Sequence, residues 1–338
     1  MRTLIWGAGA IGGTMGAYLA RAGHDVTVVD VAAEHVAAIN HDGISLTGPV
    51  AEFRQRVPAF TPETLTGEWD TIVLATKAQH TELAARALLP HLGAAGCVIS
   101  AQNGLNELAI ARIVGAARTV GAFVNFGADY LEPGVILHGS MAAVVVGEID
   151  GRITPRVAAI RDAWADFEPR AVVTPNIWGY LWGKEAYGAM LFATALTNES
   201  IADALAMPAY RHLYIALARE INAVAAARGV TPEGFDGFDP ASYLPQAPQG
   251  AAERSLDDLV AHNRRSAKTH SGIWRDLAVR KRRTEVDAQL GIVVTLAAEA
   301  GVATPLTARL VALIHDIENG ARQQSLDTLH ALAASLPH

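Results

Sequence analysis

The sequence predicts a doubly wound α/β domain followed by an all-α domain. A glycine-rich turn joins a short apolar strand to a helix near the N-terminus, which is the usual opening of such a sheet. Further β-branched strands follow, and from about Asn176 they give way to Ala- and Leu-rich segments with helical periodicity. We place the boundary near Pro169–Pro175, which predicts domains of residues 1–173 and 174–338.

Composition narrows the class of protein. Hydrophobic residues make up 51% of the 338 residues, so the chain can bury a sizeable core and is not largely disordered. The formal net charge of −7 argues against nucleic acid as a partner. The single cysteine, Cys97, excludes an intrachain disulfide and fits a cytoplasmic protein. Five glycines between Gly7 and Gly16 interrupt the apolar N-terminal segment, so we expect no membrane partner.

The first thirty residues predict one βαβ unit. Thr3–Trp6 has the pattern of a short buried strand, and Gly13–Ala22 has apolar residues at helical spacing. Gly23 ends that helix, and Asp25–Val29 is a second, β-branched strand. A unit of this kind opens a Rossmann-type sheet, which binds ligands at the carboxyl edge of its parallel strands.

The later elements follow from the same patterns. The predicted strands are Thr71–Ala75, Cys97–Ser100 and Thr119–Val124, with a hairpin of Val135–Leu137 and Ala142–Val146 at the sheet edge. The predicted helices are Glu82–Leu92, Trp182–Thr194, Tyr210–Arg228, Arg282–Ala300 and Pro305–Asn319. Residues 229–253 are rich in Pro and Gly, which predicts a long surface loop within the helical domain.

The glycine-rich turn has the spacing of a dinucleotide-binding loop. In Gly7-x-Gly9-x-x-Gly12, the first glycine permits the tight turn, the second lets a pyrophosphate approach the backbone, and the third lets the helix pack closely on the strand. The N–H groups at the helix start then face the phosphates. The alternative is a glycine-rich turn without a ligand. The loop residues expected to hold the cofactor are Gly7, Gly9, Ala10, Ile11 and Gly12.

Asp30, at the end of the second strand, bears on the choice of cofactor. It lies close to the ~20-residue spacing from the glycines at which a carboxylate accepts hydrogen bonds from the adenosine ribose. Its charge would repel the additional phosphate of NADP, and no arginine follows in Val31–Ala33. The sequence therefore favours NAD(H), unless Asp30 only caps a turn.

Three polar positions predict a catalytic site. Lys77 and Asn103 follow consecutive predicted strands, so both lie at the carboxyl edge of the sheet. Lys184 lies near the start of the first helix after the domain boundary. Reduction of a carbonyl group needs an acid that protonates the oxygen, and partial burial can lower the pKa of a lysine toward neutrality. This chemistry needs no metal, and the twelve histidines show no metal-ligand spacing.

These positions together resemble the ketopantoate reductase family, over nearly the whole chain. The resemblance implies a Rossmann domain joined to an all-helical substrate and dimerisation domain, with the active site in the cleft between them. It also admits NADP(H) as the cofactor. The segments that carry it are Gly7-x-Gly9-x-x-Gly12, Thr76-Lys77-Ala78, Gln102-Asn103-Gly104-Leu105, Gly134-Val-Ile-x-His138, Trp182-x-Lys184, Ser271-Gly-Ile-Trp-Arg-Asp276 and Arg283-Thr-Glu285-Val-Asp287.

The resemblance implies a role for each polar residue. Lys184 would be the general acid that protonates the keto oxygen, and Glu285 would hold the lysine or bind a substrate hydroxyl. Asn103 would touch the nicotinamide ribose or the substrate, with Lys77 beside the nicotinamide. Ser271 would reach the substrate carboxylate. Each has a structural alternative: a solvated lysine for Lys184 or Lys77, a surface ion pair for Glu285, an ordinary turn at Asn103 and a helix N-cap at Ser271.

The sequence also departs from the family pattern. The family commonly has an asparagine at the position of Gly188, one helical turn after Lys184, and can have a second at Phe192. We therefore expect a pocket that is wider near Gly188 and more apolar near Phe192. Ser271 matches the family serine only with a one-residue shift, which makes Gly272 its rival. The residues expected to contact the substrate are Lys184, Gly188, Ser271 and Glu285.

The leading functional hypothesis is a nicotinamide-dependent reductase of a 2-oxo acid, with Lys184 as general acid and hydride transfer to the carbonyl carbon. The substrate is ketopantoate, a bulkier or less polar 2-oxo acid, or a related carbonyl or imine. One alternative is a dehydrogenase of a hydroxy acid or secondary amine, of the opine or hydroxyacid type, that uses the same site. Another is a non-catalytic NAD(H)-binding sensor. We expect a homodimer through the Ala- and Leu-rich helical domain.

Overall fold

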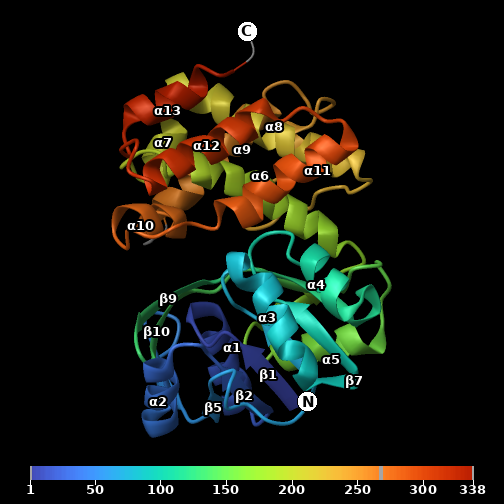
Figure 1. Ribbon diagram of the computed structural model, residues 1–338. Coiled ribbons are helices and arrows are strands. Elements are labelled where there is room, and N and C mark those ends of the chain that lie inside the picture. Colours follow the sequence, from blue (N-terminus) through green and yellow to red (C-terminus); the bar gives the residue numbers. More distant parts are fainter. Residues whose placement is uncertain (1, 266–268, 337–338) are drawn as a thin grey trace. The chain divides into compact units, whose positions relative to one another are not determined.

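The computed structural model describes residues 2–265 and 269–336 (Figure 1). The chain divides into two compact units, Met1–Ile177 and Trp178–His338. The first unit is α/β and the second is helical, which confirms the predicted fold class. Across the described residues, no helix combines the length and apolarity needed to cross a membrane.

The first unit is built on an eight-stranded sheet. Its neighbouring strands are parallel, except for β11 and β8, which are antiparallel. Strands β11 and β12, at one end of the sheet, therefore run opposite to the other six, and reversed strands at the edge of a mostly parallel sheet are common in doubly wound folds. In spatial order the strands are β12 (Val172–Val173), β11 (Val144–Glu148), β8 (Thr119–Val124), β7 (Leu92–Ser100), β6 (Trp69–Leu74), β1 (Arg2–Trp6), β2 (Asp25–Val29) and β5 (Ala59–Phe60).

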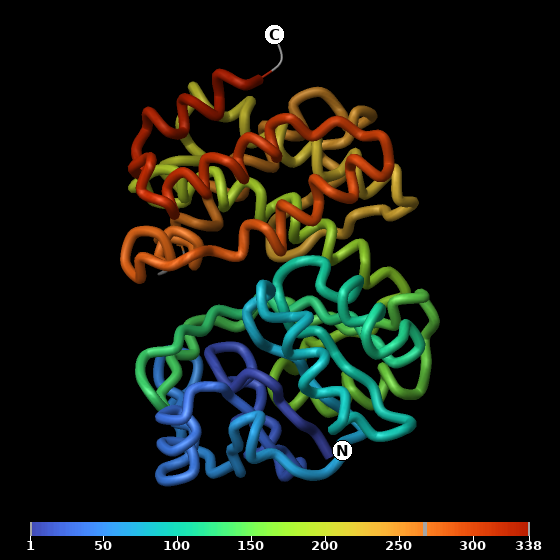
Figure 2. Tube along the Cα trace, in the orientation of Figure 1, coloured from blue at the N-terminus to red at the C-terminus, as the bar shows by residue number. Residues whose placement is uncertain are grey.

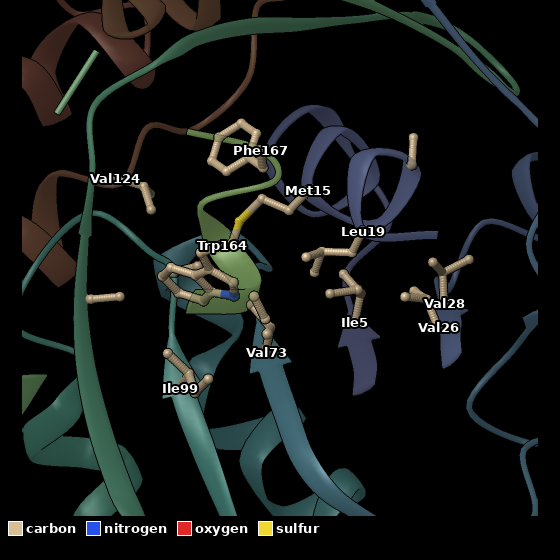
Figure 3. Packing of buried hydrophobic residues seen from close by; sticks show 14 of the residues in the cluster. Ile5, Met15, Leu19, Val26, Val28, Val73, Ile99, Val124, Trp164 and Phe167 are labelled. Atoms are coloured by element: carbon tan, nitrogen blue, oxygen red, sulfur yellow. The ribbon is translucent and has the colours of Figure 1, made fainter. Parts of the chain in front are cut away.

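Helices cover both faces of this sheet, because both faces are apolar. Adjacent residues of β1 point to opposite sides. Ile5 packs with Met15 and Trp164 on one side (Figure 3), and Leu4 packs with Leu88 on the other. The helices of the first unit are α1 (Ala10–Arg21), α2 (Ala33–Asp42), α3 (Thr81–Leu88), α4 (Glu107–Val114) and α5 (Pro155–Trp164).

The predicted edge hairpin is wrong, although its two segments are strands. Val135–Leu137 lies in a separate four-stranded sheet, whereas Val144–Glu148 pairs with β8 in the main sheet. The hairpin partner of Val135–Leu137 is instead the preceding segment, Gly127–Glu132, whose mixed polar sequence gives little strand signal. The strands of this second sheet, in spatial order, are β4 (Phe53–Gln55), β3 (Ile44–Thr47), β10 (Val135–Ser140) and β9 (Gly127–Glu132).

The second unit surrounds one long, largely buried helix, α6. Helices distant in sequence meet there: α12 packs against α8, as the chain trace shows (Figure 2). The predicted helices in these three regions are confirmed to within a few residues. The helices are α6 (Ile177–Thr194), α7 (Ile201–Ala206), α8 (Arg211–Ala227), α9 (Ala251–Arg265), α10 (Gly272–Ala278), α11 (Ile292–Ala300), α12 (Pro305–Glu318) and α13 (Leu326–Ala333).

The helix predicted from Arg282 begins later than expected. Residues 281–284 are not helical, and the helix enters α11 through a π-helical turn over Asp287–Gly291. The buried carboxylate of Asp276 explains the delay, because its Oδ1 accepts hydrogen bonds from Arg280 and Arg282, each at 3.0 Å. The two arginines fold back to this carboxylate and hold the chain in a turn.

The segment predicted as a surface loop, residues 229–253, is anchored in the core. Phe235, Phe238 and Tyr243 are buried, so the prediction of a plain surface loop is wrong. The Phe238 ring stacks between Tyr243 and Tyr187 of α6, with centroid separations of 5.5 Å to each. Proline and glycine correctly indicated irregular backbone, but the aromatic residues among them bind that backbone to α6.

Gly183 marks the point where this segment comes closest to α6. The Glu233 N–H donates a hydrogen bond to Gly179 O at 2.9 Å, one turn before Gly183. A Cβ atom on Gly183 would overlap the Glu233 carbonyl oxygen. By contrast, a Cβ on Gly188 in the same helix would have only ordinary contact with its nearest neighbour, at 3.9 Å.

We predict opposite effects of alanine at these two glycines. Gly183→Ala forces the Glu233 backbone away and should lower the free energy of unfolding by about 1–3 kcal/mol. Gly188→Ala adds no clash and lowers backbone entropy in the unfolded chain, so it should be neutral or raise that free energy by up to about 1 kcal/mol. Urea unfolding of both variants measures the difference. Equal stability of the two variants would contradict the packing described here.

Candidate active site

The glycine-rich loop leaves open space at one of its three glycines. Gly7 has φ +101°, and a Cβ there would lie 2.8 Å from Thr76 N, so the fold itself requires glycine. A Cβ on Gly12 would overlap Gly7 O. A Cβ on Gly9 would meet no atom within 4 Å. Gly9 is also the N-cap of α1 and supplies no side chain to its N–H groups, so the loop fits an approaching phosphate.

Two side chains hold the Ala8 peptide of this loop from opposite sides. Asp30 Oδ2 accepts a hydrogen bond from Ala8 N at 2.9 Å, and its Oδ1 accepts one from Ala32 N at 3.0 Å. His35 Nε2 donates to Ala8 O at 2.9 Å, while its Nδ1 accepts from Gly134 N at 2.9 Å. Asp30 thus caps a turn and also orients the loop. No pattern in the sequence pointed to His35, because its partners are backbone atoms distant along the chain.

Lys77 and Asn103 lie on exposed turns that follow β6 and β7. Buried Gln102 connects the two turns, because its Nε2 donates hydrogen bonds to Thr76 O and to Thr81 Oγ1, both at 2.9 Å. The structure therefore brings the two predicted residues to one edge of the sheet, on a hydrogen-bonded framework. Gln102 was part of the recognised motif, but its connecting role follows only from the fold.

In the second unit, Lys184 and Gly188 lie on the partly exposed face of α6. Tyr187 and Leu191 share this face, at the spacing expected of one helical stripe. Phe192, one turn after Gly188, is fully buried, and the more apolar pocket that we expected there remains a prediction.

Glu285 precedes the π-helical turn and is largely buried. Its neighbour Thr284 is held in place by Glu318 of α12, whose Oε1 accepts hydrogen bonds from both the N–H and the hydroxyl of Thr284, each at 2.7 Å. The helical surface pairing considered for Glu285 is wrong, because residues 281–284 are not helical.

Glu185, next to Lys184 in the sequence, is a site residue that sequence reasoning missed. Its side chain is buried, with the residue 1% exposed, and Oε2 has no hydrogen-bond partner among the described residues. The pKa of this carboxyl group is raised to about 8, chiefly by burial, with an opposing effect of Lys184 and a smaller contribution in the same direction from Glu285. The signal available in the sequence was a carboxylate within an otherwise apolar helix.

Ser271 has the structural role that we considered as its alternative, that of a helix N-cap. It is the N-cap of α10, and its Oγ accepts a hydrogen bond from Trp274 N at 3.1 Å. A hydroxyl that accepts this bond still has a proton to donate, so contact with a substrate remains a prediction.

The pKa of Glu185 predicts a pH-dependent stability difference. The folded protein keeps the Glu185 proton up to about pH 8, whereas the unfolded chain releases it near pH ~4.3. Stability from this group is therefore lost as pH rises between these values, by at most about 1.4 kcal/mol per unit. Glu185→Gln should raise the melting temperature above that of the wild type at pH 8 but not at pH 4.5. Glu253→Gln, at an exposed position, is the control. Parallel curves of melting temperature against pH for the wild type and both variants would refute the raised pKa of Glu185.

Family profiles match both units. The profile described as "Ketopantoate reductase PanE/ApbA" matches residues 3–151, and that described as "Ketopantoate reductase PanE/ApbA C terminal" matches residues 176–318. A 2-dehydropantoate 2-reductase from Halobacterium salinarum is 28% identical over 317 residues, which cover 93% of this chain and 98% of the relative.

Solved structures share the fold of the whole chain. A PanE/ApbA family ketopantoate reductase from Ralstonia eutropha has a TM-score of 0.79 at 24% identity, with 95% of this chain and 99% of that chain covered. D-mandelate dehydrogenase with NADH and anilino(oxo)acetate has a TM-score of 0.81 at 20% identity, with the same coverage of 95% and 99%. A ketopantoate reductase from Staphylococcus aureus with this fold is described as dimeric, at a TM-score of 0.71 and 18% identity over 95% of this chain and 100% of that one.

The consecutive profile matches, one to each unit, show that the chain belongs to the ketopantoate reductase PanE/ApbA family.

Proposed function

We propose that this protein is a nicotinamide-dependent reductase of a 2-oxo acid. The observation that carries the proposal is the environment of Lys184, an ammonium group on the partly exposed face of a largely buried helix, beside the carboxyl groups of Glu185 and Glu285. Membership of an oxidoreductase family supports it. A sensor that only bound a dinucleotide would have no use for a proton donor in this environment.

The first unit would hold the cofactor through its glycine-rich loop. The backbone at Gly7–Gly12 would bind the pyrophosphate, and Asp30 would accept hydrogen bonds from the adenosine ribose. Because Ala8 N and Ala32 N hold the carboxylate beside the loop, its negative charge disfavours an additional phosphate. We therefore favour NAD(H) over NADP(H). When bound, a reduced nicotinamide supplies the hydride.

The second unit would supply the proton. Lys184 Nζ would donate a hydrogen bond to the keto oxygen and then transfer its proton as negative charge develops there. Glu285 would orient the ammonium group. Glu185 would remain protonated near neutral pH, so it adds no second negative charge beside Lys184.

The same residues would also catalyse the reverse reaction, oxidation of a 2-hydroxy acid, because the acid that protonates an alkoxide is the base that removes its proton. The structural likeness to D-mandelate dehydrogenase keeps this direction as the second candidate. Product analysis with each oxidation state of the cofactor distinguishes the two directions. The dimeric relative agrees with a homodimer, which we retain as a proposal.

Lys184→Ala should lower kcat by about 100-fold or more, because a general acid contributes a factor of that order. Lys184→Arg keeps the charge but holds its proton too tightly to transfer it, so it should lower kcat with a smaller effect on KM. Steady-state rates with NADH, using 2-dehydropantoate and benzoylformate as substrates, measure both effects. Wild-type turnover by the alanine variant would overturn the role of Lys184.

The loop geometry predicts that alanine at Gly9 weakens cofactor binding, whereas alanine at Gly12 lowers stability. Gly9→Ala fills the open space, so the Kd for NADH should rise about tenfold or more while the melting temperature stays unchanged. Gly12→Ala should lower the melting temperature, because its Cβ overlaps Gly7 O. Fluorescence titration with NADH and NADPH provides the affinities. Undiminished NADH binding by Gly9→Ala would place the cofactor elsewhere.

A further inference from the structure

His35 of α2 connects the glycine-rich loop to the second sheet of the first unit. The residue is buried. Its Nδ1 accepts a hydrogen bond from Gly134 N, in the turn between β9 and β10, and its Nε2 donates one to Ala8 O, both at 2.9 Å. The Tyr130 ring lies edge-on to the imidazole, with the ring centroids 5.1 Å apart. Because one backbone partner is a donor and the other an acceptor, the ring is neutral and carries its hydrogen on Nε2.

The hydrogen bond to Ala8 O fixes the direction of the Gly9 N–H. These two groups belong to the same peptide unit, and the peptide bonds of the described residues are all trans. In a trans peptide unit the carbonyl and the N–H point in opposite directions. Since Ala8 O points toward His35, the Gly9 N–H points away from His35 and from α2.

The Gly9 N–H is available to a ligand. In residues 2–265 and 269–336 it donates no hydrogen bond. Gly9 is partly exposed, and a Cβ on it would meet no atom within 4 Å. Helix α1 begins at the next residue, Ala10, and the first N–H groups of a helix have no intrahelical partner. An N–H that joins such groups beside open space suits an anion such as a pyrophosphate.

We propose that His35 is a positioning residue for the cofactor, because by holding Ala8 O it directs the Gly9 N–H toward the pyrophosphate of NAD(H). His35 is buried and both its ring nitrogens bind backbone groups, so it acts through the loop and does not touch the cofactor. Glycine allows many backbone conformations, so the peptide before Gly9 needs such an external constraint. This proposal rests on the function proposed above, since it concerns the cofactor of that reaction.

Two substitutions distinguish the hydrogen bonds of His35 from its volume. His35→Phe fills the space but forms neither bond. His35→Gln supplies an amide, whose oxygen can accept from Gly134 N and whose N–H can donate to Ala8 O. Fluorescence titration should show a Kd for NADH that rises about tenfold or more in His35→Phe and stays within about threefold of the wild type in His35→Gln. His41→Phe, on the same helix with a side chain 83% exposed, is the control and should leave the Kd unchanged.

Cofactor fragments test which part of the ligand His35 affects. ADP-ribose contains the pyrophosphate, whereas adenosine does not, and both are measured as competitors of NADH. His35→Phe should raise the Ki of ADP-ribose by the same factor as the Kd of NADH, but should leave the Ki of adenosine within about twofold of the wild type. A general distortion of the site would instead raise both inhibition constants.

A measurement on the wild type is independent of whether the variants fold. In protein labelled with ¹⁵N-glycine, the NMR resonance of Gly9 is identified by its absence from the spectrum of Gly9→Ala. Exchange of the Gly9 amide hydrogen with D₂O should slow by about tenfold or more when NADH saturates the protein, because a hydrogen-bonded amide is protected. Equal exchange rates with and without NADH would overturn the proposal.

The outcomes separate this proposal from the proposed function. If the wild type does not bind NADH, both fail. If it binds NADH but reduces no 2-oxo acid, the proposed function fails, while the binding measurements still decide the role of His35. If it binds NADH and reduces a 2-oxo acid, but folded His35→Phe binds NADH as tightly, the function stands and the role of His35 is overturned. The same follows if folded His35→Gln binds as weakly as His35→Phe, or if adenosine is weakened as much as ADP-ribose.

Discussion

The structure depends on two places where backbones approach too closely for a side chain to fit between them. In the first unit, Gly7 packs against the backbone at Thr76, so that the turn after β1 lies against the end of β6. In the second, Gly183 of α6 packs against the Glu233 carbonyl. Each contact fixes an element that carries polar residues of the candidate site: the glycine-rich loop beside Lys77, and the turn of α6 that begins at Lys184.

Around these contacts, buried hydrogen bonds and acids set the local chemistry. Asp30 and His35 hold the Ala8 peptide from both sides, which orients the loop before any ligand arrives. In the second unit, Glu185 is buried next to Lys184, and a protonated carboxyl group avoids most of the desolvation penalty of a buried charge. The first unit therefore has a preorganised loop, and the second has a partly exposed ammonium group next to a buried carboxyl group.

The chain shares its fold with the family, but the fold does not specify the side chains that surround Lys184. The family profiles cover both units, and the fold follows that of its solved relatives. One turn after Lys184, Gly188 has no side chain, and a Cβ there would lie 3.9 Å from Gln289 Oε1.

The sequence by itself determined the fold class, the first βαβ unit and most core helices, because hydrophobic periodicity and glycine spacing act over short stretches of chain. It also identified Lys184, Glu285 and the glycine-rich loop as candidates. Only the tertiary structure decided which strands pair, why the helix predicted from Arg282 begins later, that His35 holds the glycine-rich loop, and that Glu185 is buried next to Lys184. Those features arise from contacts between residues far apart along the chain, such as Asp276 with two arginines, and no local pattern records a partner that folding brings from elsewhere.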